Sequence, residues 1–395
     1  MRKACITGYG VKAPDVENVH DFKMVLEEGY CTLKSIRHPY QNSQIVIGLI
    51  NHDFKKVNGQ NLTRLPRAVR VVIAAAYEAI EMANLKGNNT FHHRTGIVIG
   101  SSGGVIQEIE SISKNSLLEG LRYLRPTSIG NMNNNSISTG VSSFFQIHGP
   151  CFTVCNSCTS SIDAILLGKM LIETGQVDCC IVGGVDTTIC DIVLGGFSKL
   201  KLLQKSLVDL EGYGPFGQAN QFSLSEGAGV LVLENEEYAL NRGASILGYI
   251  KRGEMSQDAI SIYHSDSSGK FLLDIVKKVV DNEKISYVNS QALGLKENDQ
   301  IEQNIHQKVF DWKTPITSIK GMIGHALGAS GVLQCISSLI SFEYGFIPPT
   351  IHTNHDLKST IPLVTSTLYQ EVEQVLITSH GYGGNNSCLL VSRKN

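Results

Sequence analysis

FTVCNSCTSSIDAI, residues 152–165, is the stretch of sequence that decides the fold of this chain. A short β-type run breaks at Asn156-Ser157, and an apolar helical pattern follows at once. Cys158 therefore lies at the bend between a strand and a helix N-terminus. The free N–H groups and partial positive charge of a helix N-terminus favour a thiolate over a thiol. This position predicts that Cys158 is a nucleophile near neutral pH.

The ten cysteines allow other interpretations as well. A free cysteine is usually a small buried hydrophobe, and this remains the main alternative for Cys158. Cys155-x-x-Cys158 has the spacing of a redox pair, but that motif belongs in a thioredoxin-like βαβ context. A zinc site needs a second pair at ligand spacing, and Cys179-Cys180 lies in an apolar run typical of a buried strand. Redox and zinc sites are therefore disfavoured.

Composition narrows the class of protein. The 395 residues are 42% hydrophobic and include 38 glycines, which fits a compact α/β protein of one large domain or two fused halves. The net charge of −2 predicts neither a nucleic-acid nor a membrane-surface partner, and no apolar run is long enough for a membrane span. The N-terminus lacks a signal-peptide pattern, so ten cysteines indicate a cytoplasmic protein. No phosphate-binding loop or metal-ligand cluster predicts a directly bound cofactor or metal.

Short apolar runs alternate with helical stretches, the pattern of a sheet covered by helices. The predicted strands span residues 4–7, 95–100, 151–154, 178–185, 229–234, 246–252, 287–291, 315–320, 375–379 and 387–392. The predicted helices span residues 67–83, 159–175, 272–281 and 329–344. Cys158 and His325 each precede a helix rich in small residues, which indicates a duplicated α/β unit. We expect an N-terminal half over residues 1–240 and a C-terminal half over residues 241–395.

Several short motifs follow one another in a recognisable order. They are ITGYG (6–10), RTGIVIGSSGG (94–104), the Cys158 bend, GGV (183–185), SEGAG (225–229), KGMIGH (320–325) with GASG after it, and HGYGGNNS (380–387). Together they cover nearly the whole chain, and their order resembles the β-ketoacyl-ACP synthase (ketosynthase) family of the thiolase superfamily. The resemblance implies the thiolase fold, a five-layer αβαβα sandwich built from two duplicated halves.

The resemblance also implies a chemistry. In that family a thiolate accepts an acyl chain from the 4′-phosphopantetheine arm of an acyl carrier protein. Two imidazoles then hold the malonyl thioester oxygen while CO2 leaves, and a lysine helps to set the charge of the site. By motif match, Cys158 is the nucleophile, His325 the second histidine and Lys320 the lysine. No cofactor would be bound directly.

The first histidine of the family is missing. In YVNSQALGLKENDQIE, residues 287–302, Gln291 falls on its position. Leu293 and Leu295 replace two threonines that usually hydrogen-bond phosphopantetheine. A glutamine amide can donate a hydrogen bond but cannot take up a proton. Loss of one donor from an oxyanion site slows a reaction about 100- to 1,000-fold, so we do not expect ordinary decarboxylative condensation by this chain alone.

The run that carries Gln291 resembles the corresponding stretch of the chain-length factors, which are the KSβ subunits of type II polyketide synthases. Such subunits pair with a catalytic ketosynthase (KSα) and shape the tunnel in which the polyketide grows. They usually lack the nucleophile and the second histidine, whereas this chain keeps Cys158 and His325. We expect a KSβ subunit in a heterodimer. The alternatives are a β-ketoacyl-ACP synthase with an altered Cys-Gln-His site and a structural member with an inert cysteine.

The same resemblance places a gate and a tunnel. Tyr382 and His380 stand in the gate loop where phenylalanines are common, and Phe197 is a further pocket residue. His380 is either the imidazole that Gln291 lacks or an ordinary hydrogen-bonded loop residue. At helical spacing after GSSGG, three residues line the end of the tunnel or else a solvated or interface helix face. They are Val105, Glu108 and Ile112.

Overall fold

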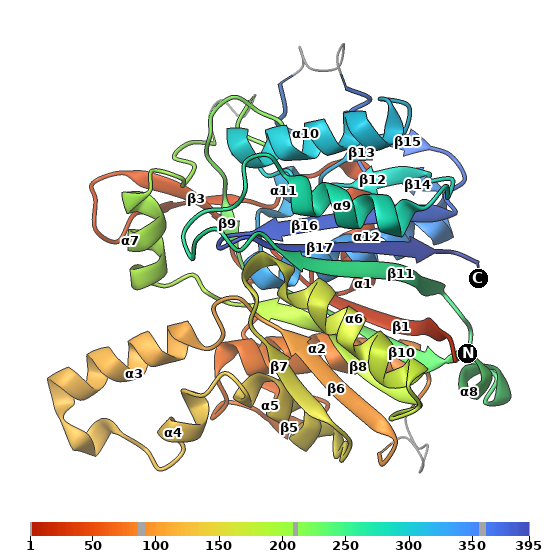
Figure 1. Cartoon of the computed structure of the whole chain (residues 1–395). Coiled ribbons are helices and arrows are strands. Elements are labelled where there is room, and N and C mark those ends of the chain that lie inside the picture. Colours follow the sequence, from red (N-terminus) through yellow and green to blue (C-terminus); the bar gives the residue numbers. More distant parts are fainter. Residues whose placement is uncertain (1, 86–91, 208–211, 355–360, 395) are drawn as a thin grey trace.

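The computed structural model describes residues 2–85, 92–207, 212–354 and 361–394 (Figure 1). Its centre is a ten-stranded mixed sheet with the order β13-β12-β16-β17-β11-β1-β10-β8-β6-β7. Two sets of five strands meet in this sheet where β1 and β11 pair through Cys5–Tyr249 and Ile6–Gly248.

The two sets have the same pattern of strand pairing. The first comprises β1 Ala4–Lys12, β10 Gly227–Asn235, β8 Cys179–Asp186, β6 Thr95–Gly100 and β7 Cys151–Val154. The second comprises β11 Gly248–Gln257, β17 Asn385–Ser392, β16 Gln374–Gly381, β12 Tyr287–Asn289 and β13 Ile316–Thr317. In each set the two pairings nearest the junction are antiparallel and the two outer pairings are parallel. The repeated pattern is that of two duplicated halves. The predicted boundary near residue 240 falls in α8 (Glu236–Asn241), between the two sets, and stays a prediction.

Helices form three layers around the two sets of strands (Figure 1). α2 (Arg67–Met82) packs on the first set and on α5 (Ser136–Phe145), while α9 (Lys270–Val280) packs on the second set with α10 (Lys296–Phe310). Between the sets, α6 (Ser160–Glu173) and α12 (Ser330–Tyr344) contact strands of both and share one large buried apolar cluster. This arrangement confirms the predicted αβαβα sandwich of the thiolase fold.

Smaller elements surround this framework. The other helices are α1 Val19–Glu28, α3 Ile106–Glu119, α4 Ser128–Asn131, α7 Asp191–Lys199 and α11 Lys320–Ile323. The other strands are β2 Lys34–Arg37, β3 Gln44–Gly48, β4 Lys56–Val57, β5 Gln60–Asn61, β9 Leu224–Ser225, β14 Phe346–Ile347 and β15 Leu368–Tyr369. Within the described ranges, none of the helices has both the length and the apolar composition that a bilayer crossing requires.

Two predicted strands are too long. The strand predicted over residues 315–320 ends at Thr317, and Lys320 instead begins α11. Ser318 turns the chain away from the sheet, because its N–H donates to Thr350 Oγ1 (3.0 Å) and its hydroxyl donates to the Ala292 carbonyl (2.7 Å). The strand predicted over residues 287–291 ends at Asn289. Both ends lie beside the site described next.

Candidate active site

The bend at Cys158 has the predicted strand–turn–helix form. After β7, a 3₁₀ turn over Ser157–Thr159 leads into α6. Ser157 has a φ of +55°, a left-handed conformation that is costly for a residue with a side chain. The Ser160 hydroxyl stabilises the turn, because it accepts the Asn156 N–H (2.9 Å) and donates to the Ser157 carbonyl (2.6 Å). Cys158 is thereby held at the junction of the two halves.

His325 reaches this junction from the second half. Its Nε2 atom lies 3.3 Å from Cys158 Sγ, and its Nδ1 atom lies 2.9 Å from Ser330 Oγ. The backbone of His325 donates to the Ser223 carbonyl (2.8 Å) and accepts the Ser225 N–H (3.0 Å), which fixes the ring's position. When the proton is on Nδ1, Nε2 is available to accept the thiol proton.

The protonation of this pair differs from the sequence prediction. Burial raises the pKa of the Cys158 thiol above its ordinary value, and the nearby charge of Lys320 opposes this only in part. Burial and the same positive charge lower the pKa of His325 to about 3. Burial thus outweighs the effect of the helix N-terminus, so at neutral pH a thiol faces a neutral imidazole; that Cys158 acts as the nucleophile stays a prediction. The imidazole must take the proton as the sulfur attacks.

A buried charged cluster lies behind the cysteine–histidine pair. Lys320 Nζ donates to the Ser290 carbonyl (3.3 Å), and burial lowers the pKa of Lys320 to about 8. Glu302 accepts hydrogen bonds from Ser290 Oγ (2.6 Å) and Thr378 Oγ1 (2.8 Å), and its Oε1 lies 3.1 Å from His380 Nε2. Burial alone would raise the pKa of Glu302, but the contact with His380 and the two hydroxyls hold it below its usual range. Glu302 is thus a carboxylate at neutral pH.

Gln291 follows β12 and is fully buried. Its backbone N–H donates to Thr378 Oγ1 (3.2 Å), and its Nε2 donates to the His380 carbonyl (3.2 Å). The second bond fixes the amide's orientation, because an amide oxygen in that place would face the carbonyl oxygen. Gln291 Oε1 has no hydrogen-bond partner among the residues that the structure describes.

A cavity of about 620 Å³ brings most of the predicted site residues together. Those in its lining are Cys158, His325, Gln291, His380, Tyr382 and Phe197. Its apolar walls include Val193, Leu200, Leu202, Phe222, Leu293, Leu295 and Leu327. Lys320 is buried outside the lining, close enough to change the charge balance of the thiol. The cavity can hold an apolar chain with its reactive end at Cys158.

The three residues predicted for the tunnel end lie elsewhere, at or near the start of α3. Val105 is buried in the cluster around α2, and Ile112 is buried on α3. Glu108 is half-buried, with its Oε1 3.5 Å from Asn131 Nδ2. None of the three lines the 620 Å³ cavity. Their position at a tunnel end in an assembled pair of subunits stays a prediction.

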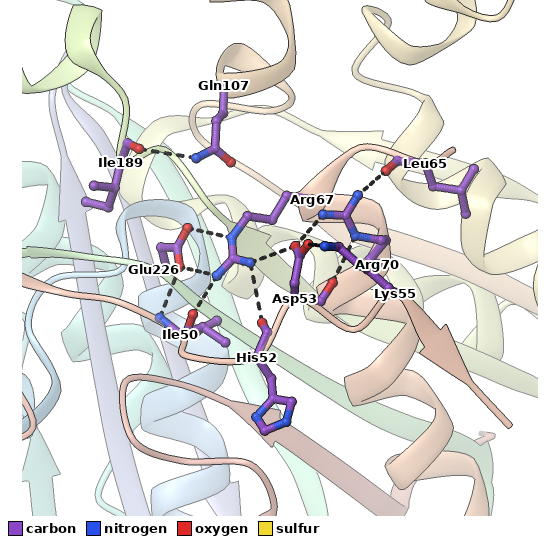
Figure 2. Close-up of polar contacts among 10 residues, drawn as sticks. All are labelled: Ile50, His52, Asp53, Lys55, Leu65, Arg67, Arg70, Gln107, Ile189 and Glu226. Atoms are coloured by element: carbon purple, nitrogen blue, oxygen red, sulfur yellow. Dashed lines mark hydrogen bonds and ion pairs between the residues drawn. The ribbon is translucent and has the colours of Figure 1, made fainter. Parts of the chain in front are cut away.

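An ion-pair network surrounds Glu226, which directly follows β9 (Figure 2). Arg67 forms a bidentate pair with the buried Glu226, with Nε–Oε1 at 3.0 Å and Nη2–Oε2 at 2.8 Å. The Ile50 N–H also donates to Glu226 Oε2 (3.0 Å). Because Glu226 directly follows Ser225, whose N–H bonds the His325 carbonyl, the network helps to position the imidazole.

Sequence reasoning did not assign a role to three side chains of the site. Ser330 contacts His325 Nδ1, Phe222 packs edge-on against the His325 ring with centroids 5.6 Å apart, and Glu302 contacts His380. Ser330 lies in the GASG motif and Glu302 at the end of the residue 287–302 run, so both had a sequence signal. Phe222 had none beyond its place shortly before SEGAG.

The thiolase fold and the buried cysteine–histidine pair beside an apolar cavity define a thiolase-like protein with a ketosynthase-type site. Comparison with known protein families supports the same class of protein. The family described as "Beta-ketoacyl synthase, N-terminal domain" matches residues 1–239, and "Beta-ketoacyl synthase, C-terminal domain" matches residues 247–354. The chain therefore belongs to the β-ketoacyl synthase family.

Its relatives include a protein named as an acyl-carrier-protein synthase and one named as a polyketide synthase. The chain is 28% identical to the chloroplastic 3-oxoacyl-[acyl-carrier-protein] synthase I of Arabidopsis thaliana, over 85% of this chain and 74% of that protein. It is also 28% identical to the putative polyketide beta-ketoacyl synthase 1 of Streptomyces virginiae, over 99% of this chain and 98% of that protein.

Solved structures show the same fold in paired subunits. The structure titled "The ishigamide ketosynthase/chain length factor" has a TM-score of 0.90 and 25% identity, with full coverage of both chains. The ketosynthase ApeO in complex with its chain length factor ApeC from Xenorhabdus doucetiae has a TM-score of 0.85 and 22% identity, over 99% of this chain and 98% of that chain. The chain is thus similar to chains from structures titled as ketosynthase and chain-length-factor pairs.

Proposed function

We propose that this chain is a KSβ/chain-length-factor subunit of a type II polyketide synthase, or of a related polyene or fatty-acid-like synthase. It pairs with a catalytic ketosynthase and shapes the tunnel for the growing acyl chain. The observation that carries the proposal is Gln291. An enolate that forms beside Cys158 and His325 meets one imidazole and one amide, and the amide's Nε2 already donates to the His380 carbonyl. The amide therefore has at most one N–H left for the enolate, and it cannot take up a proton as an imidazole can.

A projecting apolar segment supports the pairing. Figure 1 shows α3 and α4 extending away from the body of the molecule. Leu117, Leu118 and Leu121 are 87%, 84% and 84% exposed, and Ile129 on α4 is 70% exposed. β7, at the edge of the ten-stranded sheet, carries the half-exposed Phe152. Exposed apolar side chains and an edge strand are both features of a subunit interface.

An acyl carrier protein is the second partner in this proposal. Its 4′-phosphopantetheine arm would deliver the acyl group, and the chain would bind no other cofactor. The cavity fits such an arm, because its lining combines apolar walls with polar atoms of Gln291 and His380 and includes Cys158. When bound, the arm supplies the thioester, and the chain's own residues orient it and manage the thiol proton.

A second function is favoured by the intact cysteine–histidine pair. With Cys158 Sγ 3.3 Å from His325 Nε2, the chain has the geometry for acyl transfer. The sulfur attacks the thioester carbonyl while His325 takes its proton. The carrier thiolate then leaves and receives that proton, so the acyl group remains on Cys158. A β-ketoacyl-ACP synthase with an altered Cys-Gln-His site would add condensation with malonyl-ACP to this step.

Coexpression with a ketosynthase encoded by a neighbouring gene tests the proposal. Native mass spectrometry should show a stable one-to-one heterodimer, and replacement of Leu118 and Leu121 by Glu should weaken it because charged side chains would be buried in the interface. A matched variant, Leu240→Glu on the exposed face of α8, should leave the complex intact. A homodimer that elongates acyl-ACP without a partner would refute the proposal.

A further inference from the structure

A buried carboxylate near the reactive pair has no role in the acyl transfer step. Asp186, the last residue of β8, is 0% exposed, and burial raises its pKa to about 6, so it is ionised at neutral pH. In the described part of the chain, the groups that donate to this carboxylate are all neutral. A buried charge costs free energy unless other groups compensate it. The groups that compensate this charge therefore indicate the role of Asp186.

Four donors converge on the carboxylate of Asp186. Its Oδ1 accepts the Ser101 hydroxyl (3.0 Å) and the Gly103 N–H (2.8 Å). Its Oδ2 accepts the Ser102 N–H (2.9 Å) and the Gly328 N–H (2.7 Å). An asparagine in this place would turn its NH2 group toward two of these donors. Only a carboxylate can therefore accept from all four.

These hydrogen bonds join the two halves of the chain. Three of the donors belong to the loop between β6 and α3 in the first half, whereas Gly328 belongs to the 3₁₀ turn Leu327–Ala329 in the second half. The two backbones approach closely here, since a Cβ atom on Gly328 would lie 2.5 Å from Ser102 N and 2.8 Å from Asp186 Oδ2. Asp186 is thus a direct link from the first half to this turn.

The turn that Asp186 contacts lies in the segment that carries the His325 imidazole. It begins two residues after His325 and ends directly before Ser330, whose Oγ lies 2.9 Å from His325 Nδ1. Leu327, the first residue of the turn, lines the cavity and has a φ of +45°, a costly conformation for a residue with a side chain. Such a conformation persists only where the surrounding structure holds it. The bond from the Gly328 N–H to Asp186 provides part of that support.

We propose that Asp186 is a positioning residue for His325. Its carboxylate fixes the 3₁₀ turn that follows His325, and the turn sets the direction in which the ring's Nε2 atom faces Cys158 Sγ. Asp186 acts through the turn and exchanges no proton with the thiol. The proposal rests on the proposed function only in that acyl transfer to Cys158 provides one of its two readouts.

Asp186→Asn tests this role on the purified full-length chain. Acylation of Cys158 by butyryl N-acetylcysteamine, read by intact mass, should slow about 10- to 100-fold, the effect of a misplaced catalytic group. In a His325→Ala background the same substitution should cause no further slowing, because residues that act as a unit are not additive. Gly328→Ala, which disturbs the same link from the second half, should give the same two results. An equal slowing in both backgrounds, or no slowing in the parent background, would overturn the proposal.

A second readout requires no acyl transfer. In chains with isotopically labelled histidine, Asp186→Asn and Gly328→Ala should each shift the NMR signals of the His325 ring nitrogens, which His325→Ala identifies by their loss. Asp274→Asn, the same chemical change at an exposed position of α9, should leave these signals and the acylation rate as in the parent. Shifted signals without any acylation of the parent would support the positioning role and refute acyl transfer. Unshifted His325 signals in both variants would overturn the positioning role.

Discussion

Gln291→His is the substitution that should restore what this site lacks. Gln291 is fully buried and lines the same cavity as Cys158 and His325. An imidazole in its place would give the developing enolate oxygen a second preorganised donor. One such donor is worth about 100- to 1,000-fold in rate, or roughly 3–4 kcal/mol of activation free energy. We therefore expect the variant to release CO2 from malonyl-ACP about 100-fold faster than the parent chain.

The assay follows CO2 release under single-turnover conditions, with Cys158 acylation measured in parallel by intact mass. Gln291→Asn is the matched control, because it keeps an amide and should not gain activity. Adding His325→Ala to the histidine variant should abolish the gain, since only one imidazole would remain. If Gln291→His folds, is acylated at the parent rate and still releases CO2 no faster, the oxyanion reasoning is refuted.

Three further predictions concern the thiol and its supports. His325→Ala removes the acceptor of the thiol proton, so acylation of Cys158 by an acyl thioester should slow about 100- to 10,000-fold by intact mass; a loss below tenfold would contradict this role. Lys320→Met removes a positive charge that lowers the pKa of the Cys158 thiol, so the pH midpoint of iodoacetamide alkylation should rise. An unchanged or lower midpoint would show that the Lys320 charge does not lower the pKa of the Cys158 thiol. Arg67→Met leaves the buried Glu226 carboxylate unpaired and should lower the free energy of unfolding by about 3–5 kcal/mol in urea titrations; a loss under about 1 kcal/mol would be inconsistent with the network in Figure 2.

The sandwich was predictable because its signals are local and ordered. The strand before Cys158 and the helix after it follow from residues 152–165 alone, and the repeated motif order implied the duplicated fold. The missed turn at Ser318 is not local, since its hydrogen-bond partners, Thr350 and Ala292, come from distant segments. α10 was also missed, because only a narrow stripe of apolar residues around Ile301 and Ile305 marks it as a helix.

The residues of the site could be predicted from the sequence, but their protonation states could not. Motif order identified Cys158, His325 and Gln291, and the structure brings all three into one cavity. The pKa of the Cys158 thiol is raised because both halves of the chain bury it. No local sequence pattern shows this burial. The contact between His380 and Glu302 likewise joins β16 to α10 and required the packed structure.

The most direct measurement is the rate at which the purified chain, without any partner, releases CO2 from malonyl-ACP. Because Gln291 places an amide where a second imidazole would be needed, we expect the isolated chain to release CO2 no faster than the Cys158→Ala variant. The rate should increase markedly only when the catalytic ketosynthase is added. Sustained turnover by the isolated parent chain, lost on replacement of Cys158, would contradict the account.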